Sequence, residues 1–378
     1  INQSMDRYLA SGVFRDMGPG IVVLDRRTCY HPSRVGVVLA IHLDDYEYVP
    51  GAGGLVRATE GTVLERIPPR LRIRKDAALE IPHVQLLVDD PGRTAIEPLL
   101  RMCRNGDFPV AYTAELFPDG GQATGWFVPF ADSAGKGPAA IAGFLRALSR
   151  LASFHESGFL FAVGDGNHSL ATAKTHWEAL KAAGAPDGHP ASMAMVEVVN
   201  LHDPGLEFEA IHRVVFGAGL QALREALESV CGECGCGLHF RSFQEPGRAV
   251  RYSAGCDPDV QAIPMTDGQA ALVMIFRDPP HPMAVGSLQI LLDAVARRIP
   301  VRIDYIHGEE TLLRLCGPQA TGFFLPRPAK SGLFGAVARD GVLPRKSFSM
   351  GEACEKRYYV ESRRIVSVDA ETGGHGHG

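Results

Sequence analysis

The sequence lacks the long apolar run that a membrane span requires. None of its 378 residues falls in a stretch of roughly 18 to 20 uninterrupted apolar residues, which is the length that crosses a bilayer. The first residues also lack the basic, apolar and small-residue order of a secretory signal peptide. The chain starts at Ile1 rather than at a methionine, so processing or truncation stays open. We expect a cytoplasmic protein that does not interact with membranes.

An excess of charge of one sign is also missing. Lys and Arg number 38 against 43 Asp and Glu, and the formal net charge is -5. Such a balance gives no global basic field for nucleic acid, which we do not expect as a partner, although a local basic patch stays open. Apolar residues make up 46% and charged residues 21% of the chain, which excludes a disordered or fibrous protein.

Cysteines are too few for a disulfide scaffold, since the chain has 8. One stretch, "CGECGCGLH", gathers Cys231, Cys234, Cys236 and His239 within a short segment. Its first two cysteines have the two-residue spacing that lets both thiolates reach one zinc ion, and Cys256 could approach in the fold. The distant pair of ligands that would complete a zinc ribbon is absent, so we favour a glycine-rich turn with incidental thiols and keep zinc as the alternative.

Hydrophobic patterning predicts interleaved strands and helices. The expected strands in the first third are 35–49, 81–89 and 108–116, with a helix over 92–106. A small-residue, glycine-rich stretch at 132–140 then indicates a linker. It is followed by a long amphipathic helix over 139–156, a short buried strand over 159–164 and a helix over 170–184. Strand and helix signals alternate from there to about residue 368.

This pattern predicts an α+β (mixed α/β) fold, with mixed sheets flanked by helices. We expect two closely packed domains: an N-terminal α/β domain over 1–134 and a C-terminal α+β domain over 135–368. The glycine-rich end at 369–378, with its two histidines, is expected to be a disordered tail.

The stretch "FAVGDGNHSLATAK" at 161–174 carries the densest chemistry. A strand that ends in a glycine-flanked turn and enters a helix directs backbone N–H groups and the positive end of the helix dipole at one point, which suits an anion. Gly164 and Gly166 permit a sharp turn. The turn is neither a P-loop, because no lysine follows the last glycine, nor a dinucleotide fingerprint, because the third glycine is missing.

A purely structural role for the turn is the alternative. Asn167 or Ser169 could simply cap the next helix, as Asn and Ser often do. Capping alone leaves Asp165 and His168 unexplained. We therefore favour a functional site at this turn.

The residues resemble a known family at this point. The turn "VGDGNHSLATAK", together with "FEAIHRVVF" at 208–216, "LPRKSF" at 343–348 and "VRATEGTVLERIPPRLRIRKDA" at 56–77, is similar to the domain-of-unknown-function 1015 family (DUF1015) of bacteria and archaea. The resemblance runs from roughly residue 35 to 368. No function comes with it, because none is established for the family.

This chain is a Gly-Asp-Gly-Asn-His-Ser variant of the family. Many members place a second histidine and then an arginine where it has Asn167-His168-Ser169. The fuller family pattern is similar to the Gly-His-Arg turn of the ParB and sulfiredoxin-like superfamily, which includes nucleotide-binding proteins and a free-serine kinase. The resemblance implies a turn that opens a helix and contacts nucleotide phosphates. With Ser169 in the arginine's place, that positive charge must come from elsewhere.

Candidate site residues follow from the turn and the resemblance. Arg213 offers a planar fork to phosphate oxygens and Lys346 a point charge, although each could equally be a surface charge. Carboxylates can act as bases or as Mg²⁺ ligands, although Glu60 could also be a solvated loop residue. The candidate catalytic residues are Asp165, His168 and Glu60, and the candidate ligand-binding residues are Gly164, Gly166, Asn167, Ser169, His212, Arg213 and Lys346.

Two functions fit these residues. The first is an enzyme that acts on a phosphorylated small metabolite or nucleotide by phosphoryl transfer, as a phosphotransferase or a phosphohydrolase, with Mg²⁺ and ATP or ADP as candidate cofactors. The serine-kinase relative extends this guess to amino-acid phosphate metabolism. The second is a non-catalytic nucleotide sensor or ParB-like regulatory protein. The sequence leaves the oligomeric state open.

Overall fold

The computed structural model describes residues 1–49, 51, 53–81, 84–117, 119–233, 235–351 and 359–366. Strands and helices alternate throughout this part of the chain, and the sheets are mixed, which confirms the expected α+β (mixed α/β) class. The predicted tail at 369–378 lies outside the described residues.

The chain divides into two compact units. Unit 1 comprises Ile1–Glu207, Lys330–Val342 and Gly351–Gly378, and unit 2 comprises Phe208–Ala329 and Leu343–Met350. The predicted boundary at residues 134 and 135 lies within unit 1, in the turn before a helix that packs on a strand of the same sheet. The division of the chain into these two units therefore does not coincide with the predicted domain boundary. Close packing of two domains stays a prediction.

A nine-stranded sheet forms the centre of unit 1, in the order β3-β4-β9-β6-β10-β2-β1-β8-β7. Parallel pairs join β3 to β4, β4 to β9 and β6 to β10, while the other neighbours are antiparallel. The strands are β1 (Gly20–Arg27), β2 (Arg34–His42), β3 (Tyr46–Glu47), β4 (Val56–Arg57), β6 (Gln85–Val88), β7 (Val110–Leu116), β8 (Gly121–Pro129), β9 (Phe161–Asp165) and β10 (Met193–Asn200).

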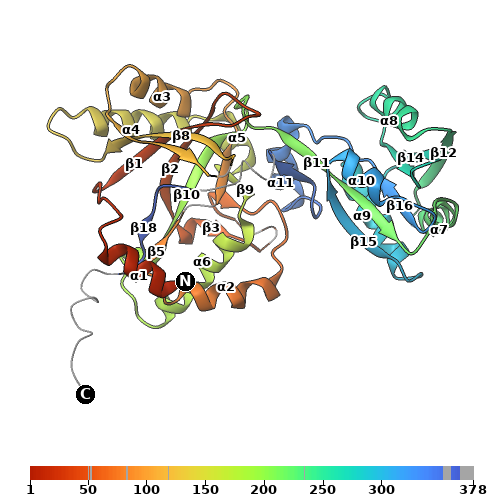
Figure 1. Cartoon of the computed structure of the whole chain (residues 1–378), viewed down its shortest axis with the longest axis horizontal. Coiled ribbons are helices and arrows are strands. Elements are labelled where there is room, and N and C mark those ends of the chain that lie inside the picture. Colours follow the sequence, from red (N-terminus) through yellow and green to blue (C-terminus); the bar gives the residue numbers. More distant parts are fainter. Residues whose placement is uncertain are drawn as a thin grey trace. The chain divides into compact units, whose positions relative to one another are not determined.

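Several helices of unit 1 share an apolar core with one face of this sheet. The helices of unit 1 are α1 (Asn2–Ala10), α2 (Ile67–Arg74), α3 (Ile96–Arg104), α4 (Lys136–Leu148), α5 (Ala152–Ser157), α6 (Asn167–Ala182) and α11 (Leu333–Asp340). Side chains of α3, α4 and α6, among them Leu99, Phe144 and Trp177, join the main core with strand residues. Helix α2 packs beside α6 (Figure 1).

The opposite face of the sheet receives the returning C-terminal segment. Tyr359 donates a hydrogen bond to the fully buried carboxylate of Glu197 at 2.7 Å, and Arg363 bonds Glu80. A short two-stranded sheet of β5 (Leu79–Glu80) and β18 (Arg363–Arg364) completes this contact. Residues far apart in sequence therefore belong to one folded unit.

Unit 2 is built on a second, seven-stranded sheet. Its strands follow the order β12-β14-β13-β16-β11-β15, and β17 pairs with β11. They are β11 (Phe208–Phe216), β12 (Gly237–Phe243), β13 (Ala262–Thr266), β14 (Ala271–Arg277), β15 (Arg302–His307), β16 (Ala320–Phe323) and β17 (Phe348–Met350); the helices are α7 (Leu220–Glu233), α8 (Pro246–Ala254), α9 (Ala284–Ala296) and α10 (Glu309–Leu315). Helices α7 and α9 pack together and share an apolar core with the sheet.

The long helix expected over 139–156 is instead two helices. α4 ends before Ser149, and Leu151 takes an extended conformation with φ -64° and ψ 131° before α5 begins. Apolar residues continue at helical spacing across the break, because Leu148 and Leu151 both reach the core. The periodicity therefore could not reveal it.

Candidate anion site at the strand–turn–helix

The turn at 164–169 joins β9 to α6, as the sequence predicts. Gly166 is the N-cap residue of α6 and has φ +90°, a left-handed conformation that favours glycine. A glycine has no side chain to accept hydrogen bonds from the first N–H groups of the helix. The 16-residue helix therefore starts with its positive dipole end at a residue that cannot cap it.

Asn167 ties the turn to the glutamate-threonine stretch. Its side chain is only 7% exposed, and its Oδ1 accepts a hydrogen bond from the Thr59 N–H at 3.3 Å. The Thr59 hydroxyl donates in turn to the Val163 carbonyl at 2.6 Å. Asn167 thus connects the start of α6 to the glutamate-threonine stretch. This hydrogen bond is not that of a local helix cap, the alternative considered from the sequence.

His168 makes the second connection between the same segments. Its Nε2 accepts a hydrogen bond from the Val63 N–H at 3.2 Å. An imidazole that accepts at Nε2 is neutral and carries its proton on Nδ1. The lone pair of Nε2 is therefore occupied in this arrangement.

Glu60 lies between these two connections. Because Thr59 and Val63 are each bonded to one of the first two residues of α6, the loop 59–63 closes over the start of the helix. Within this loop, the hydroxyl of Thr62 is buried and has no hydrogen-bond partner among the described residues. A buried hydroxyl without a partner is uncommon, and a bound ligand could satisfy it.

Asp165 lies at the same sheet edge as Glu60. Strands β4 and β9 are parallel, with Arg57 opposite Ala162, so their carboxyl ends meet at one edge. Ligands of open α/β sheets commonly bind at such carboxyl ends. The Asp165 carboxylate accepts the N–H of Gly166 at 2.8 Å, which holds it at the mouth of the turn.

Arg213, expected to contact a ligand, is buried in unit 2. Its guanidinium is 0% exposed and lies over the ring of Tyr305, 4.6 Å from the centroid. Nη2 donates to the carbonyls of Arg345 at 2.9 Å and Lys346 at 3.0 Å, and Nε donates to Gln289. The guanidinium therefore links β11 to the backbone of residues 345 and 346.

His212 and Lys346 lie next to Arg213 in unit 2: His212 precedes it in β11, and the Lys346 carbonyl accepts its hydrogen bond. Burial, and next the charge of Arg213, lower the pKa of His212 to about 4, so the imidazole is neutral at pH 7. Its Nδ1 accepts the N–H of Leu325 at 3.1 Å. Lys346 is half-buried and has φ +56°, unusual for a residue with a side chain.

The four family segments therefore form two pairs. Unit 1 brings the Glu60 loop and the turn together, and unit 2 brings Arg213 and Lys346 together. One site that includes all four segments stays a prediction.

The cysteine-rich stretch contains a disulfide between Cys231 and Cys236. Cys234 lies outside the described residues, so the zinc alternative for this stretch can be followed only in part. In the described part of the chain, no group of three or more histidine, cysteine or acidic residues could hold a metal ion. Two of the three clustered thiols are paired with each other.

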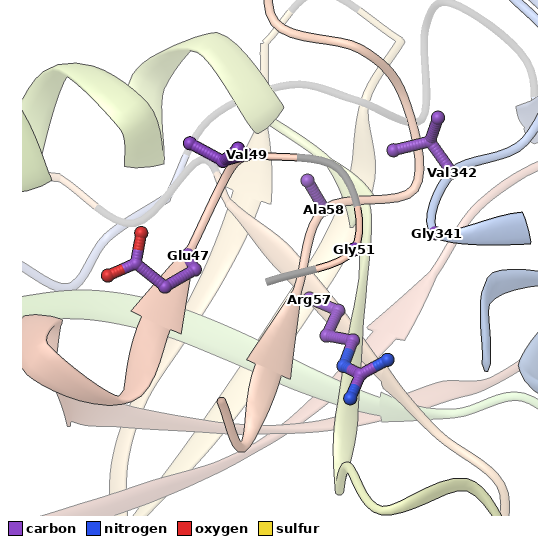
Figure 2. Close-up of a pocket in the computed structure, with 7 residues that line it drawn as sticks. All are labelled: Glu47, Val49, Gly51, Arg57, Ala58, Gly341 and Val342. Atoms are coloured by element: carbon purple, nitrogen blue, oxygen red, sulfur yellow. The ribbon is translucent and has the colours of Figure 1, made fainter. Parts of the chain in front are cut away.

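A shallow pocket lies near the site without including it. It is lined by residues of β3, β4 and two neighbouring segments: Glu47, Val49, Gly51, Arg57, Ala58, Gly341 and Val342. In Figure 2, the guanidinium of Arg57 points away from the carboxylate of Glu47. None of the predicted site residues is among these lining residues, and the pocket gives the site no support.

Sequence reasoning missed the part played by Thr59, Thr62 and Val63. The two threonines flank Glu60 in "ATEGT", which could have indicated a polar loop with a fixed conformation. Their contacts depend on the parallel pairing of a two-residue strand, which no sequence pattern reveals.

The fold and the turn define the class of this protein: a mixed α/β protein in which a glycine-flanked strand–turn–helix opens at the edge of the larger sheet. A family model described as "Protein of unknown function (DUF1015)" matches residues 1–294, and the chain belongs to this family. The predicted family is confirmed. The match includes the Glu60 loop, the turn and Arg213, whereas 343–348 lies beyond it.

No curated protein is significantly similar to the chain. Among solved structures, a conserved hypothetical protein from Pyrococcus furiosus has 11% identity and a TM-score of 0.41, over 87% of this chain and 95% of that one. A free serine kinase in complex with AMP has 11% identity and a TM-score of 0.43, over 87% and 91%. SbnI from Staphylococcus aureus has 10% identity and a TM-score of 0.42, over 84% and 83%. Likenesses this distant assign no function to the chain.

Among the described residues, no helix combines the length and apolar character that crossing a membrane requires.

Proposed function

We propose that the protein is an enzyme that binds a phosphorylated small metabolite or nucleotide at the start of α6 and catalyses phosphoryl transfer, as a phosphotransferase or a phosphohydrolase. The observation that carries this proposal is the glycine-capped start of α6 under the loop 59–63. The backbone N–H groups of a helix start bind phosphate oxygens, and the helix dipole favours the negative charge.

The two carboxylates supply the chemistry that such a reaction needs. Glu60 and Asp165 come from the carboxyl ends of two parallel strands at one edge. Either could accept the proton of an attacking hydroxyl, and both offer the oxygen ligands that Mg²⁺ prefers. A bound Mg²⁺ would neutralise phosphate charge, and Thr62 or Ser169 could donate hydrogen bonds to phosphate oxygens.

We infer that the Gly-Asp-Gly-Asn-His-Ser turn is a variant of the Gly-His-Arg turn of the ParB and sulfiredoxin-like superfamily, in which Ser169 replaces the arginine. An amino acid such as serine, with ATP or ADP, is then the first substrate pair to try.

Turnover tests the proposal directly. ³¹P NMR would follow the wild type with ATP, Mg²⁺ and serine, beside Asp165→Asn and Glu60→Gln. Asp187→Asn is the control, because Asp187 is an exposed carboxylate away from the turn. We expect ATP consumption by the wild type and the control, and a loss of at least about a hundredfold in Asp165→Asn, the usual contribution of a general base.

Two outcomes would change the proposal. An unchanged rate in Asp165→Asn would remove Asp165 from the mechanism. Nucleotide binding without turnover for any acceptor would favour the non-catalytic nucleotide sensor or ParB-like regulator.

A further inference from the structure

Helix α2 gathers positive charge beside the proposed anion site. The net charge of the whole chain is -5, yet residues 66–75, "RIPPRLRIRK", contain four arginines, one lysine and no carboxylate. Arg74 Nη2 lies 2.8 Å from Glu80 Oε2. Arg70 and Arg72, in contrast, are exposed. This segment is the local basic patch that the balanced composition left open, and like the turn at 164–169 it belongs to unit 1.

Three hydrogen bonds connect Arg70 to the start of α6. Arg70 Nη1 donates to the Arg66 carbonyl at 2.9 Å, so the side chain of Arg70 folds back toward the start of α2. The Arg66 N–H donates to the Val63 carbonyl at 3.0 Å, across the short 3-10 helix Leu64–Arg66. The Val63 N–H in turn donates to His168 Nε2 at 3.2 Å. The Arg70 guanidinium is thereby anchored to the segment that contacts the turn.

Helices α2 and α6 lie side by side (Figure 1). Shortly before α2 begins, Val63 contacts His168, the second residue of α6. Farther along both helices, burial and next the charge of Arg74, the last residue of α2, lower the pKa of His176. The two helices therefore run in the same direction, and their starts, with the positive ends of their dipoles, lie on the same side.

Arg70 adjoins the packed face of α2. It follows the buried Ile67 by three residues and precedes the half-buried Arg74 by four, and helical residues at these spacings are neighbours on one face. Arg72 is about 200° around the helix from Arg70, because each residue of an α-helix turns by about 100°. Arg70 thus stands beside the face that packs on α6, and Arg72 stands on the opposite side.

The backbone of α2 cannot bind an anion in the way that the backbone of α6 can. Pro68 and Pro69 stand in the first turn of α2 and have no N–H to donate. The guanidinium of Arg70 has five N–H donors in a planar fork that matches phosphate oxygens, and one of them goes to the Arg66 carbonyl. Helix α6 therefore offers backbone N–H groups to an anion, and α2 offers a cation.

We propose that the Arg70 guanidinium binds a phosphate group of the ligand held at the start of α6. Arg70 thereby supplies, from the neighbouring helix of the same unit, the positive charge that Ser169 cannot supply. This inference rests on the proposed function, because its ligand is the phosphorylated compound proposed above. It replaces direct phosphate contact by Arg213, whose guanidinium is buried in unit 2.

Titration calorimetry with ADP and with inorganic pyrophosphate tests this inference. Arg70→Gln removes the charge and keeps a polar side chain. Arg72→Gln is the matched control, because it removes the same charge from the opposite side of the same helix. We expect Arg70→Gln to weaken the binding of both compounds by at least about tenfold, the effect of losing one hydrogen bond between charged groups. Arg72→Gln should weaken it by at most about twofold at 0.15 M salt, which screens charges beyond roughly 8 Å.

Thermal unfolding of the same variants without ligand separates binding from stability. The hydrogen bond from Arg70 to the Arg66 carbonyl is exposed, so we expect Arg70→Gln to unfold at nearly the same midpoint as the wild type. A merely structural arginine would lower this midpoint and leave both affinities unchanged, and that result would overturn the inference.

The outcomes also separate this inference from the proposed function. If the wild type and Arg70→Gln bind ADP equally, the inference fails and the proposed function stands. An equal loss in Arg70→Gln and Arg72→Gln would overturn it too, because the general charge of α2 would then explain the effect. A loss for ADP without a loss for pyrophosphate would overturn the contact with phosphate. If the wild type binds neither ADP, pyrophosphate nor phosphoserine, the proposed function and this inference both fail.

Discussion

Two helices of unit 1, α4 and α6, begin in the same way but differ in what occupies their first turn. Each has a glycine N-cap in the left-handed region, Gly135 at φ +66° and Gly166 at φ +90°. In α4 the carboxylate of Asp132 accepts the N–H groups of Lys136 at 3.1 Å and Gly137 at 2.6 Å. The chain's own anion thus occupies the start of α4.

The position of the aspartate explains the difference. Asp132 stands three residues before its glycine cap, in a turn that folds back over the helix. Asp165 stands directly before its cap, in β9, and its carboxylate accepts the N–H of the cap residue Gly166. A strand residue cannot fold back over the next helix. The start of α4 thus binds a carboxylate of the chain itself, and at α6 a ligand can take that role.

Among these variants, Asn167→Ala should have the largest effect on stability. It removes the hydrogen bond from the Thr59 N–H to the first residue of α6. The Thr59 N–H would lose its acceptor in a residue that is 1% exposed, at a cost of about 1–3 kcal/mol in the free energy of unfolding. Chemical denaturation would measure it. Asn167→Asp keeps an acceptor and should retain most of that stability, so an equal loss in both variants would contradict the role of this bond.

Alanine at either glycine cap should have a somewhat smaller effect. Gly166→Ala and Gly135→Ala each force a side chain into the left-handed region, at about 1–2 kcal/mol. Only Gly166→Ala should also weaken the response to phosphate compounds. The control is Gly143→Ala within α4, where a Cβ meets no atom within 4 Å and a gain of about 0.5–1 kcal/mol is expected.

The smallest effect should come from Asp132→Asn, because Asp132 is only half-buried and water still screens its charge. Hydrogen bonds from the N–H groups, first that of Gly137, lower the pKa of Asp132 below its ordinary 3.8. A carboxylate with a lowered pKa in the folded state stabilises above its unfolded pKa, and this stability is lost as pH falls through the folded pKa. The unfolding midpoint of Asp132→Asn should therefore lie below that of the wild type at pH 7 and approach it below pH 4. A constant difference across this range would contradict the assignment.

The turn was predictable because its elements are local. Gly166 at a positive φ, the buried strand before it and the apolar face of α6 all leave signals within a few residues of each other. The family motifs also drew attention to the loop of Glu60 and the segment of Lys346, but they did not indicate what these segments contact.

What could not be predicted depends on long-range pairing. The alignment of β4 with β9 puts Thr59 beside Val163, and nothing in a two-residue strand announces it. Arg213 looks like a ligand contact in sequence, since its burial at 0% exposure arises only when β11, β15 and α9 meet. The return of 330–342 and 359–366 to unit 1 likewise has no local signal.

The central claim is that the start of α6 binds a phosphate-bearing compound, and thermal unfolding with inorganic phosphate, phosphoserine, ADP and ATP, each with and without Mg²⁺, tests it most directly. A ligand that binds only the folded protein stabilises it by about 2.7 kcal/mol at a hundred times its Kd. Asn167→Asp adds a negative charge at the site while keeping the bond to Thr59. The account predicts a midpoint that rises with ligand concentration in the wild type and not in Asn167→Asp. No rise in the wild type, or an equal rise in both, would contradict it.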